Sequence, residues 1–197
     1  VFVIANEKLI GMIALMDQVR DSAIDAIRVL KDMNVETIML TGDNYKVANF
    51  IGKKLSINKV IAEVLPHQKS HEIEKLQKEN KKIAMTGDGI NDAPSLAKAD
   101  IGIAIGAGTD VALETADIIL VKSNPLDVVN IIKLSKATYR KMIQNLIWAT
   151  GYNVLALPLA AGVLFNQGIL ISPALGAVFM SLSTVIVAIN AKLLKID

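Results

Sequence analysis

The chain has 197 residues, of which 52% are hydrophobic and 20% charged, and its formal net charge is +2. This near balance of charge gives no reason to expect nucleic acid as a partner. The absence of cysteine excludes disulfides and thiolate metal sites within the chain. A mean hydropathy of +0.45 at this length suits one soluble domain joined to a more apolar segment.

Short apolar runs alternate with amphipathic helical patterns before the long apolar segment begins. Helices are predicted at residues 21–33, 45–55 and 68–79, with another starting near Ala93. Strands are predicted at residues 37–40, 59–64, 83–85, 101–105 and 118–121. Strands that alternate with helices favour a parallel sheet covered on both faces. We therefore expect a Rossmann-type parallel α/β domain, followed from Leu126 by one long helical pattern.

A turn dense in polar residues follows the third of these strands. Its glycines, Gly87 and Gly89, allow a tight turn and a close approach to a ligand. Asp88 and Asp92 offer the hard oxygen ligands that Mg²⁺ takes, and Asn91 could hydrogen-bond a phosphate without adding negative charge. In open α/β sheets, ligands bind at the carboxyl ends of strands. The turn therefore predicts a Mg²⁺ and phosphate site, and an ordinary Asp/Asn/Gly-rich surface turn is the alternative.

A similar turn, Thr41-Gly42-Asp43, comes directly after the strand predicted at residues 37–40. A hydroxyl followed by glycine at a strand end can present its side chain and backbone N–H groups to a phosphate. Between the two turns Pro66 opens a charged helix, so Lys69 lies in its first turn. A lysine there runs against the helix dipole, which favours anions at that end. Lys69 is therefore a candidate functional residue, and a surface lysine without function is the alternative.

The last third of the chain is strongly apolar. Nothing ionisable except Tyr152 occurs between Lys141 and Lys192. The two apolar segments of this region, 142–165 and 169–191, each exceed the ~20 residues that a helix needs to cross a ~30 Å hydrocarbon layer. Basic residues flank the pair, so by the positive-inside rule both ends face the cytoplasm. We predict a transmembrane hairpin, with the hydrophobic core hairpin of a soluble protein as the alternative.

Polar and thioether side chains lie at matching depth inside both predicted spans. Thioether sulfur beside oxygen and amide ligands suits a soft monovalent metal such as Cu⁺ or Ag⁺. Polar contacts that only hold helices together, at ~0.6 kcal/mol each on average, would explain one or two of these residues. The candidate metal ligands are Asn145, Tyr152, Asn153, Met180, Ser183, Thr184 and Asn190.

Together these motifs resemble those of the heavy-metal P-type ATPases. The soluble motifs that carry the resemblance are Thr41-Gly42-Asp43, Pro66 with Lys69, and residues 86–92, 104–110 and 116–120. In the apolar segment, Asn145 with Tyr152-Asn153 and Pro158 looks like the seventh-helix pattern. Met180 to Thr184 with Asn190 is similar to the eighth-helix pattern. The Ser183-Thr184 ending is similar to the copper-exporting type B branch.

The resemblance implies a haloacid-dehalogenase-like phosphorylation domain over residues 1–136 and two transmembrane helices with a short cytoplasmic tail over residues 137–197. It implies that Thr41 and Lys69 contact an aspartyl-phosphate and that Asp88 binds the catalytic Mg²⁺. Asn91 and Asp92 would complete that site.

The resemblance also implies what the protein works with. ATP and Mg²⁺ would be the cofactors, and Cu⁺, or alternatively Ag⁺ or Cu²⁺, would be the transported ion. The partners would be the lipid bilayer and the remainder of a pump, namely an actuator domain, a nucleotide-binding domain and upstream transmembrane helices. The expected location is the plasma membrane, with the phosphorylation domain and the carboxyl terminus in the cytoplasm.

One departure from the family pattern limits what this chain does alone. The family's nucleophile is an aspartate followed by Lys-Thr-Gly-Thr, and no aspartate here precedes Lys-Thr. The chain begins with Val1 inside an apolar run, so we expect the carboxyl-terminal piece of a longer pump, inactive by itself. A membrane-tethered phosphatase of the same superfamily is the alternative. A non-catalytic regulatory subunit would have no use for intact phosphate and Mg²⁺ turns.

Overall fold

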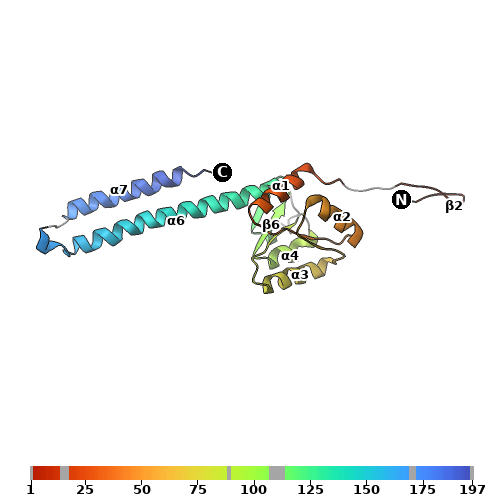
Figure 1. The fold of residues 1–197 in the computed structure, drawn as a ribbon, viewed down its shortest axis with the longest axis horizontal. Helices are drawn as coiled ribbons and strands as arrows, with labels where there is room; N and C mark the ends of the chain where they lie inside the picture. The colour runs from red at the N-terminus through yellow and green to blue at the C-terminus, as the bar shows by residue number, and fades with distance from the viewer. Residues whose placement is uncertain (1, 14–17, 88–89, 107–113, 169–171, 196–197) are drawn as a thin grey trace. The chain divides into compact units, whose positions relative to one another are not determined.

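The computed structural model describes residues 2–13, 18–87, 90–106, 114–168 and 172–195. The chain divides into two compact units, Val1–Val129 and Asn130–Asp197 (Figure 1). The boundary between the units falls inside the long helix α6 (Leu126–Ala160). The domain division expected between residues 136 and 137 stays a prediction.

The first unit opens with an antiparallel hairpin that is not among the elements expected from the sequence. Strands β1 (Phe2–Ala5) and β2 (Lys8–Met12) are paired, with a register shift between Val3 and Ile4. The two turn residues, Asn6 and Glu7, both have positive φ, 49° and 61°. Two-residue hairpin turns with this left-handed backbone match the twist of their strands.

The remaining strands of the first unit are parallel, as expected. Strands β3 (Ile38–Leu40) and β4 (Lys59–Ile61) form one pair. A second sheet has the order β5-β6-β7, with β5 at Ala84–Gly87, β6 at Ile101–Ile105 and β7 at Ile118–Leu120. Leu40, the last residue of β3, packs against the core cluster that contains Met85 of β5. This packing brings the ends of β3 and β5 into one part of the unit.

The strands are connected and covered by helices α1 (Asp21–Asp32), α2 (Tyr45–Leu55), α3 (Pro66–Lys78) and α4 (Ala93–Lys98). Helices α1 and α2 contact each other and α2 packs on β4, whereas α4 packs on α3, β5 and β6. The buried core includes Ile73 of α3, Leu96 of α4 and Ile103 of β6. The amphipathic patterns read from the sequence therefore correspond to helices that bury one face.

Local chemistry explains where the elements differ from expectation. Helix α3 begins two residues early because proline suits the first helical position, and the Gln68 side chain accepts a hydrogen bond from Leu65 N–H at 3.2 Å. Strand β4 ends at Ile61, short of the predicted residue 64. The chain turns there because Glu63 adopts φ +59° and Val64 N–H donates back to the Thr41 carbonyl at 3.1 Å.

The second unit consists mainly of two helices that run side by side (Figure 1). Helix α6 contains Pro158 and ends at Ala160; a short 3₁₀ turn, η2 (Phe165–Gln167), follows, and α7 spans Pro173–Lys192. Among the described residues, one helical segment, Ala174–Lys192, has the length and apolar composition needed to cross a membrane. The span expected at 142–165 is helical only as far as residue 160 and stays a prediction.

Candidate functional site

Thr41 is held in place by the turn that it opens. Its hydroxyl donates to Asp43 Oδ2 at 3.0 Å and accepts from Asp43 N–H at 3.1 Å. Its backbone N–H donates to the Ile61 carbonyl at 3.0 Å, which ties the turn to β4. Asn44 then caps α2 by accepting from Val47 N–H at 3.0 Å. Asp43 therefore orients the Thr41 hydroxyl, and Gly42 lies exposed between them.

Glu63 supports this turn, although it is not among the candidate residues predicted from the sequence. Its backbone N–H donates to the Asp43 carbonyl at 3.0 Å, and its carboxylate accepts from Tyr45 N–H at 3.2 Å. Both contacts depend on the left-handed backbone of Glu63, at φ +59°. A glutamate directly after the apolar run Val60-Ile61-Ala62 carries no sequence signal for this role.

The second predicted turn begins at Gly87, the last residue of β5, and leads through the 3₁₀ helix η1 (Ile90–Asp92) into α4. A Cβ atom on Gly87 would lie 2.7 Å from the Asp92 Cβ and 2.8 Å from its Oδ2. Only glycine allows the backbone and the Asp92 carboxylate to approach so closely. Asn91 is exposed beside Asp92. Asp88 and Gly89, both predicted site residues, lie outside the described residues.

Lys69 and Asp92 form a direct ion pair. The Lys69 Nζ lies 2.7 Å from Asp92 Oδ1, and the two side chains are only 15% and 14% exposed. They come from the first turn of α3 and the end of η1, two segments in contact. Partly buried ion pairs lose solvation on both sides, so they persist only with good geometry. The structure thus brings together two charges that the sequence assigned separately to phosphate and to Mg²⁺.

No group of three or more His, Cys, Asp or Glu side chains suited to a metal occurs in the part of the chain that the structure describes. The Asp92 carboxylate is still a hard oxygen ligand of the type that Mg²⁺ takes. The other predicted Mg²⁺ ligand, Asp88, lies outside the described residues. The described part of this turn therefore offers Mg²⁺ one carboxylate ligand, Asp92. In this structure that carboxylate is paired with Lys69.

In the second unit, the seven predicted ion ligands fall into separate groups. Asn190 donates from its amide nitrogen to Asn145 Oδ1 at 2.7 Å, and its oxygen accepts from Lys141 Nζ at 2.8 Å. From the sequence alone, Lys141 is only a charge that flanks the apolar segment. Asn145 and Asn190 thus form a polar link between α6 and α7, with Lys141 as its third member.

A second group surrounds Tyr152. Its hydroxyl donates to the Gly176 carbonyl at 3.1 Å, and its ring lies 6.4 Å from that of Phe179. Tyr152 and Ser183 line the same hollow of about 160 Å³, together with Trp148, Phe179, Leu182 and Ile186. This hollow is mainly apolar and aromatic, which the motif alone did not indicate.

The remaining three predicted ligands, Asn153, Met180 and Thr184, are exposed in this unit. The Thr184 hydroxyl donates to the Met180 carbonyl one turn earlier, at 3.1 Å, and the Met180 residue is 66% exposed. Hydroxyls that bond back to the preceding turn satisfy themselves within their own helix. The structure therefore joins four of the seven candidates in two groups and leaves three on open faces.

The folded first unit has the parallel strands, the strand-end turns and the Lys–Asp pair of a haloacid-dehalogenase-like domain. The family described as haloacid dehalogenase-like hydrolase matches residues 1–100. The chain belongs to this family.

Two curated proteins show the closer relationship. The chain is 56% identical over 195 residues to the copper-exporting P-type ATPase B of Archaeoglobus fulgidus, covering 99% of this chain and 28% of that protein. It is 53% identical to a probable copper-transporting P-type ATPase B of Staphylococcus aureus, covering 99% of this chain and 29% of that protein. The chain therefore spans less than a third of the length of these relatives.

A solved structure agrees with both comparisons. The crystal structure of a zinc-transporting PIB-type ATPase in the E2.Pi state matches 98% of this chain and 31% of that chain, with a TM-score of 0.85 and 37% identity. The resemblance to heavy-metal P-type ATPases and the haloacid-dehalogenase-like fold expected from the motifs are confirmed.

Proposed function

We propose that this chain works as the phosphorylation-domain and carboxyl-terminal membrane part of an ATP-driven heavy-metal pump that forms an aspartyl-phosphate. The observation that carries this proposal is the partly buried Lys69–Asp92 ion pair, at 2.7 Å, beside the strand-end turns. Its support is the similarity to copper-exporting pumps along 99% of the chain. Copper is the proposed cargo, as Cu⁺, with Ag⁺ and Cu²⁺ as alternatives.

Each described residue then has a role. An incoming phosphoryl group would offer oxygens to the Lys69 ammonium, in competition with Asp92 Oδ1. The Thr41 hydroxyl, held by Asp43 at 3.0 Å, would donate to the same group. Such donors act mainly by electrostatic stabilisation, because they are positioned before the reaction begins. Thr41 and Lys69 would therefore bind phosphate, and Asp43 would position Thr41.

Phosphate binding would also change the state of Asp92. Once Lys69 turns to the phosphate, the Asp92 carboxylate loses its partner at 2.7 Å and is left as a partly buried anion. Asp92, with Asp88, would hold Mg²⁺, which when bound neutralises charge on the phosphoryl oxygens. Asn91 and the glycines at 87 and 89 would complete the wall of this site, as the sequence predicts.

The nucleophilic aspartate must come from elsewhere in the pump, because no aspartate in this chain precedes Lys-Thr. The remaining partners are the actuator domain, the nucleotide-binding domain and the upstream transmembrane helices. For the chain alone we therefore propose neither ATP hydrolysis nor phosphorylation.

Helices α6 and α7 would lie in the bilayer as a hairpin. Large apolar side chains are exposed on both, including Trp148 at 58%, Leu155 at 70% and Val178 at 64%. Surfaces of this kind suit lipid or neighbouring membrane helices. The basic residues at the open end of the hairpin favour a cytoplasmic location for that end and for the phosphorylation domain. The plasma membrane is the proposed location, as the family resemblance implies.

The test is phosphorylation of the complete pump by labelled ATP. The wild type should incorporate acid-stable phosphate that hydroxylamine releases, as expected of an acyl phosphate. Lys69→Ala should lower incorporation by about 100-fold, the usual cost of losing one preorganised donor. Lys75→Ala is the matched control, since Lys75 lies on the same helix in a surface ion pair with Glu72. Hydrolysis of a small phosphate ester without phosphoenzyme would instead support the membrane-tethered phosphatase.

A further inference from the structure

The second unit carries a strong excess of positive charge. Between Asp127 and Asp197 the sequence has no Asp or Glu. Six Lys and Arg residues occur in the same stretch: Lys133, Lys136, Arg140, Lys141, Lys192 and Lys195. Lys141 is engaged with Asn190. In the described residues, no carboxylate forms an ion pair with the other five.

Four of these cations converge on one hollow of about 160 Å³, which we call the basic pocket. Its lining residues are Lys133, Lys136, Ala137, Arg140 and Lys195. The first four come from successive turns of α6, at spacings that place them on one face, and Lys195 comes from the segment after α7. The positive-inside rule explains why cations lie at this end of the hairpin. It does not explain why they line one cavity to which the described part of the chain contributes no carboxylate.

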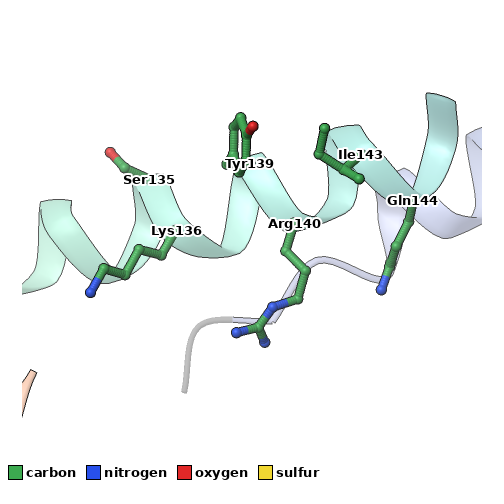
Figure 2. Close-up of a pocket in the computed structure, with 6 residues that line it drawn as sticks. All are labelled: Ser135, Lys136, Tyr139, Arg140, Ile143 and Gln144. Atoms are coloured by element: carbon green, nitrogen blue, oxygen red, sulfur yellow. The ribbon is translucent and has the colours of Figure 1, made fainter. Parts of the chain in front are cut away.

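A larger hollow adjoins the basic pocket along α6. It measures about 610 Å³ and shares Lys136 and Arg140 with the basic pocket. Figure 2 shows Lys136, Arg140 and Gln144 leaving α6 on one side, and Ser135, Tyr139 and Ile143 on the other. Beyond Lys141 this helix has no ionisable residue except Tyr152. The hollow therefore leads from a cluster of cations toward the apolar part of the helix.

A ligand that suits both hollows has an anionic head and an apolar body. The Arg140 guanidinium can bind phosphate oxygens in a bidentate manner, and the lysines add point charges around it. Tyr139 is 62% exposed on the same helix. Exposed tyrosines are common at the level of lipid headgroups. A free phosphate would satisfy the cations but would make no use of the adjoining hollow.

We infer that the basic pocket binds the phosphate of an anionic glycerophospholipid in the cytoplasmic leaflet. The glycerol and acyl chains of this lipid lie along the larger hollow of α6. Basic pockets beside membrane helices are known as a general class of anionic-lipid sites. This inference rests on the proposed insertion of the hairpin into the bilayer, and the experiment separates the two.

Trp148 provides the probe, because it is the chain's single tryptophan. It lies eight residues beyond Arg140, about 12 Å deeper along the helix, at the level of the acyl chains. The chain is reconstituted in phosphatidylcholine vesicles, and brominated phosphatidylglycerol or brominated phosphatidylcholine is added at equal mole fraction. Brominated phosphatidylglycerol should quench Trp148 fluorescence at least about twofold more strongly.

Substitutions test whether the basic pocket causes this preference for phosphatidylglycerol. The double substitution Lys136→Gln/Arg140→Gln should remove it, whereas Lys136→Arg/Arg140→Lys should retain it. The matched control Lys53→Gln/Lys54→Gln removes two exposed charges from α2 and should behave as wild type. Far-UV circular dichroism checks that every variant keeps its helices.

Three results would overturn the inference. They are equal quenching by the two brominated lipids in the wild type, an undiminished preference in Lys136→Gln/Arg140→Gln, and loss of the preference when inorganic phosphate replaces chloride at constant ionic strength. The last result would assign the basic pocket to free phosphate. Absence of quenching by either lipid would show that Trp148 is not in the bilayer, and would overturn the proposed membrane hairpin as well.

Discussion

Asp92 is the residue at which folding and proposed chemistry meet. Its carboxylate lies 2.7 Å from Lys69 Nζ, and both side chains are mostly buried. Removing one member of such a pair leaves the other charge without compensation, which costs more than the pair contributes. Gly87 allows the close approach of Asp92 to the strand end. A substitution at Asp92 is therefore expected to affect both the Lys69 position and the predicted Mg²⁺ site.

In the complete pump, Asp92→Asn should lower phosphoenzyme formation from ATP by at least about 100-fold, on the scale of one preorganised electrostatic contact. Asp88→Asn should do likewise, because it removes the other predicted Mg²⁺ ligand. Asp25→Asn is the control, since Asp25 forms an exposed ion pair with Arg28 on α1 rather than a contact at this turn. Near-normal turnover in both site variants would mean that the turn is structural.

Asp100 has a role in stability instead. Its carboxylate accepts from Lys82 Nζ at 2.8 Å, Ile83 N–H at 3.0 Å and Gln77 at 3.2 Å. These contacts, led by the Lys82 hydrogen bond, lower the pKa of Asp100 from 3.8 to about 2. A carboxyl group whose pKa is lower in the folded state stabilises the fold above its unfolded pKa. That contribution is lost as the pH falls from about 4 toward 2.

The wild type and Asp100→Asn should therefore differ in how their free energy of unfolding depends on pH. The free energy of unfolding of the wild-type chain, measured with urea in detergent, should fall between pH 5 and pH 2 more steeply than that of Asp100→Asn. Glu72→Gln, which removes a surface ion pair on α3, serves as the control carboxylate. Parallel profiles for the wild type and Asp100→Asn would show that these hydrogen bonds do not hold in solution.

The sequence predicted many of these residues but not their partners. Thr41, Lys69 and Asp92 were candidates because each lies at a strand end or in a first helical turn. The Lys69–Asp92 contact could not be predicted, because it depends on how α3 meets η1 in space. Glu63 was missed for a similar reason: its role comes from a left-handed backbone that its residue type does not favour.

At the scale of elements, strong local signals gave accurate boundaries. Helix α2 runs from Tyr45 to Leu55 as predicted, because Asn44 caps its start and Ser56 ends it in the left-handed conformation, at φ +58°. The β1–β2 hairpin was not predicted, since Asn6-Glu7 lacks the glycine that usually marks such a turn. Non-glycine residues in left-handed turns carry a weak sequence signal.

Gly102 tests how closely the elements of the first unit pack. It lies in β6, where a Cβ atom would be 2.6 Å from the Leu96 carbonyl oxygen of α4. This contact is with backbone, so relief requires α4 to move. Gly102→Ala should destabilise the first unit by about 1–3 kcal/mol, as overpacking usually does.

Urea unfolding followed by circular dichroism measures this change. The control is Gly151→Ala in α6, where nothing lies within 4 Å of the added Cβ. Alanine favours helix over glycine by about 1 kcal/mol, so this control should be neutral or slightly stabilising. A neutral effect of Gly102→Ala would mean that β6 and α4 are less tightly packed than they are in the structure.

For the whole molecule, the proposed pump assigns chemistry to one unit and the ion path to the other. The predicted ion ligands do not form one cluster within α6 and α7. Asn145 and Asn190 bind each other, whereas Asn153 and Met180 lie on exposed faces. Exposed polar and thioether groups on membrane helices favour contact with other parts of a bundle. We therefore expect upstream helices to complete the ion site. The arrangement of its ligands could not be predicted from the sequence of two spans alone.

Substitutions at the ion site in the second unit should consequently impair metal stimulation without impairing the phosphorylation chemistry of the first unit. In the complete pump, Asn153→Ala and Met180→Ala should abolish metal-stimulated ATPase activity, because each removes a side chain near the middle of a span. Phosphorylation from inorganic phosphate needs no transported ion, so it should survive in both variants. Ser181→Ala is the control, since the Ser181 hydroxyl already bonds the Ala177 carbonyl at 3.0 Å. Equal loss of both phosphorylation routes would indicate misfolding, and normal metal stimulation would remove Asn153 and Met180 from the ion site.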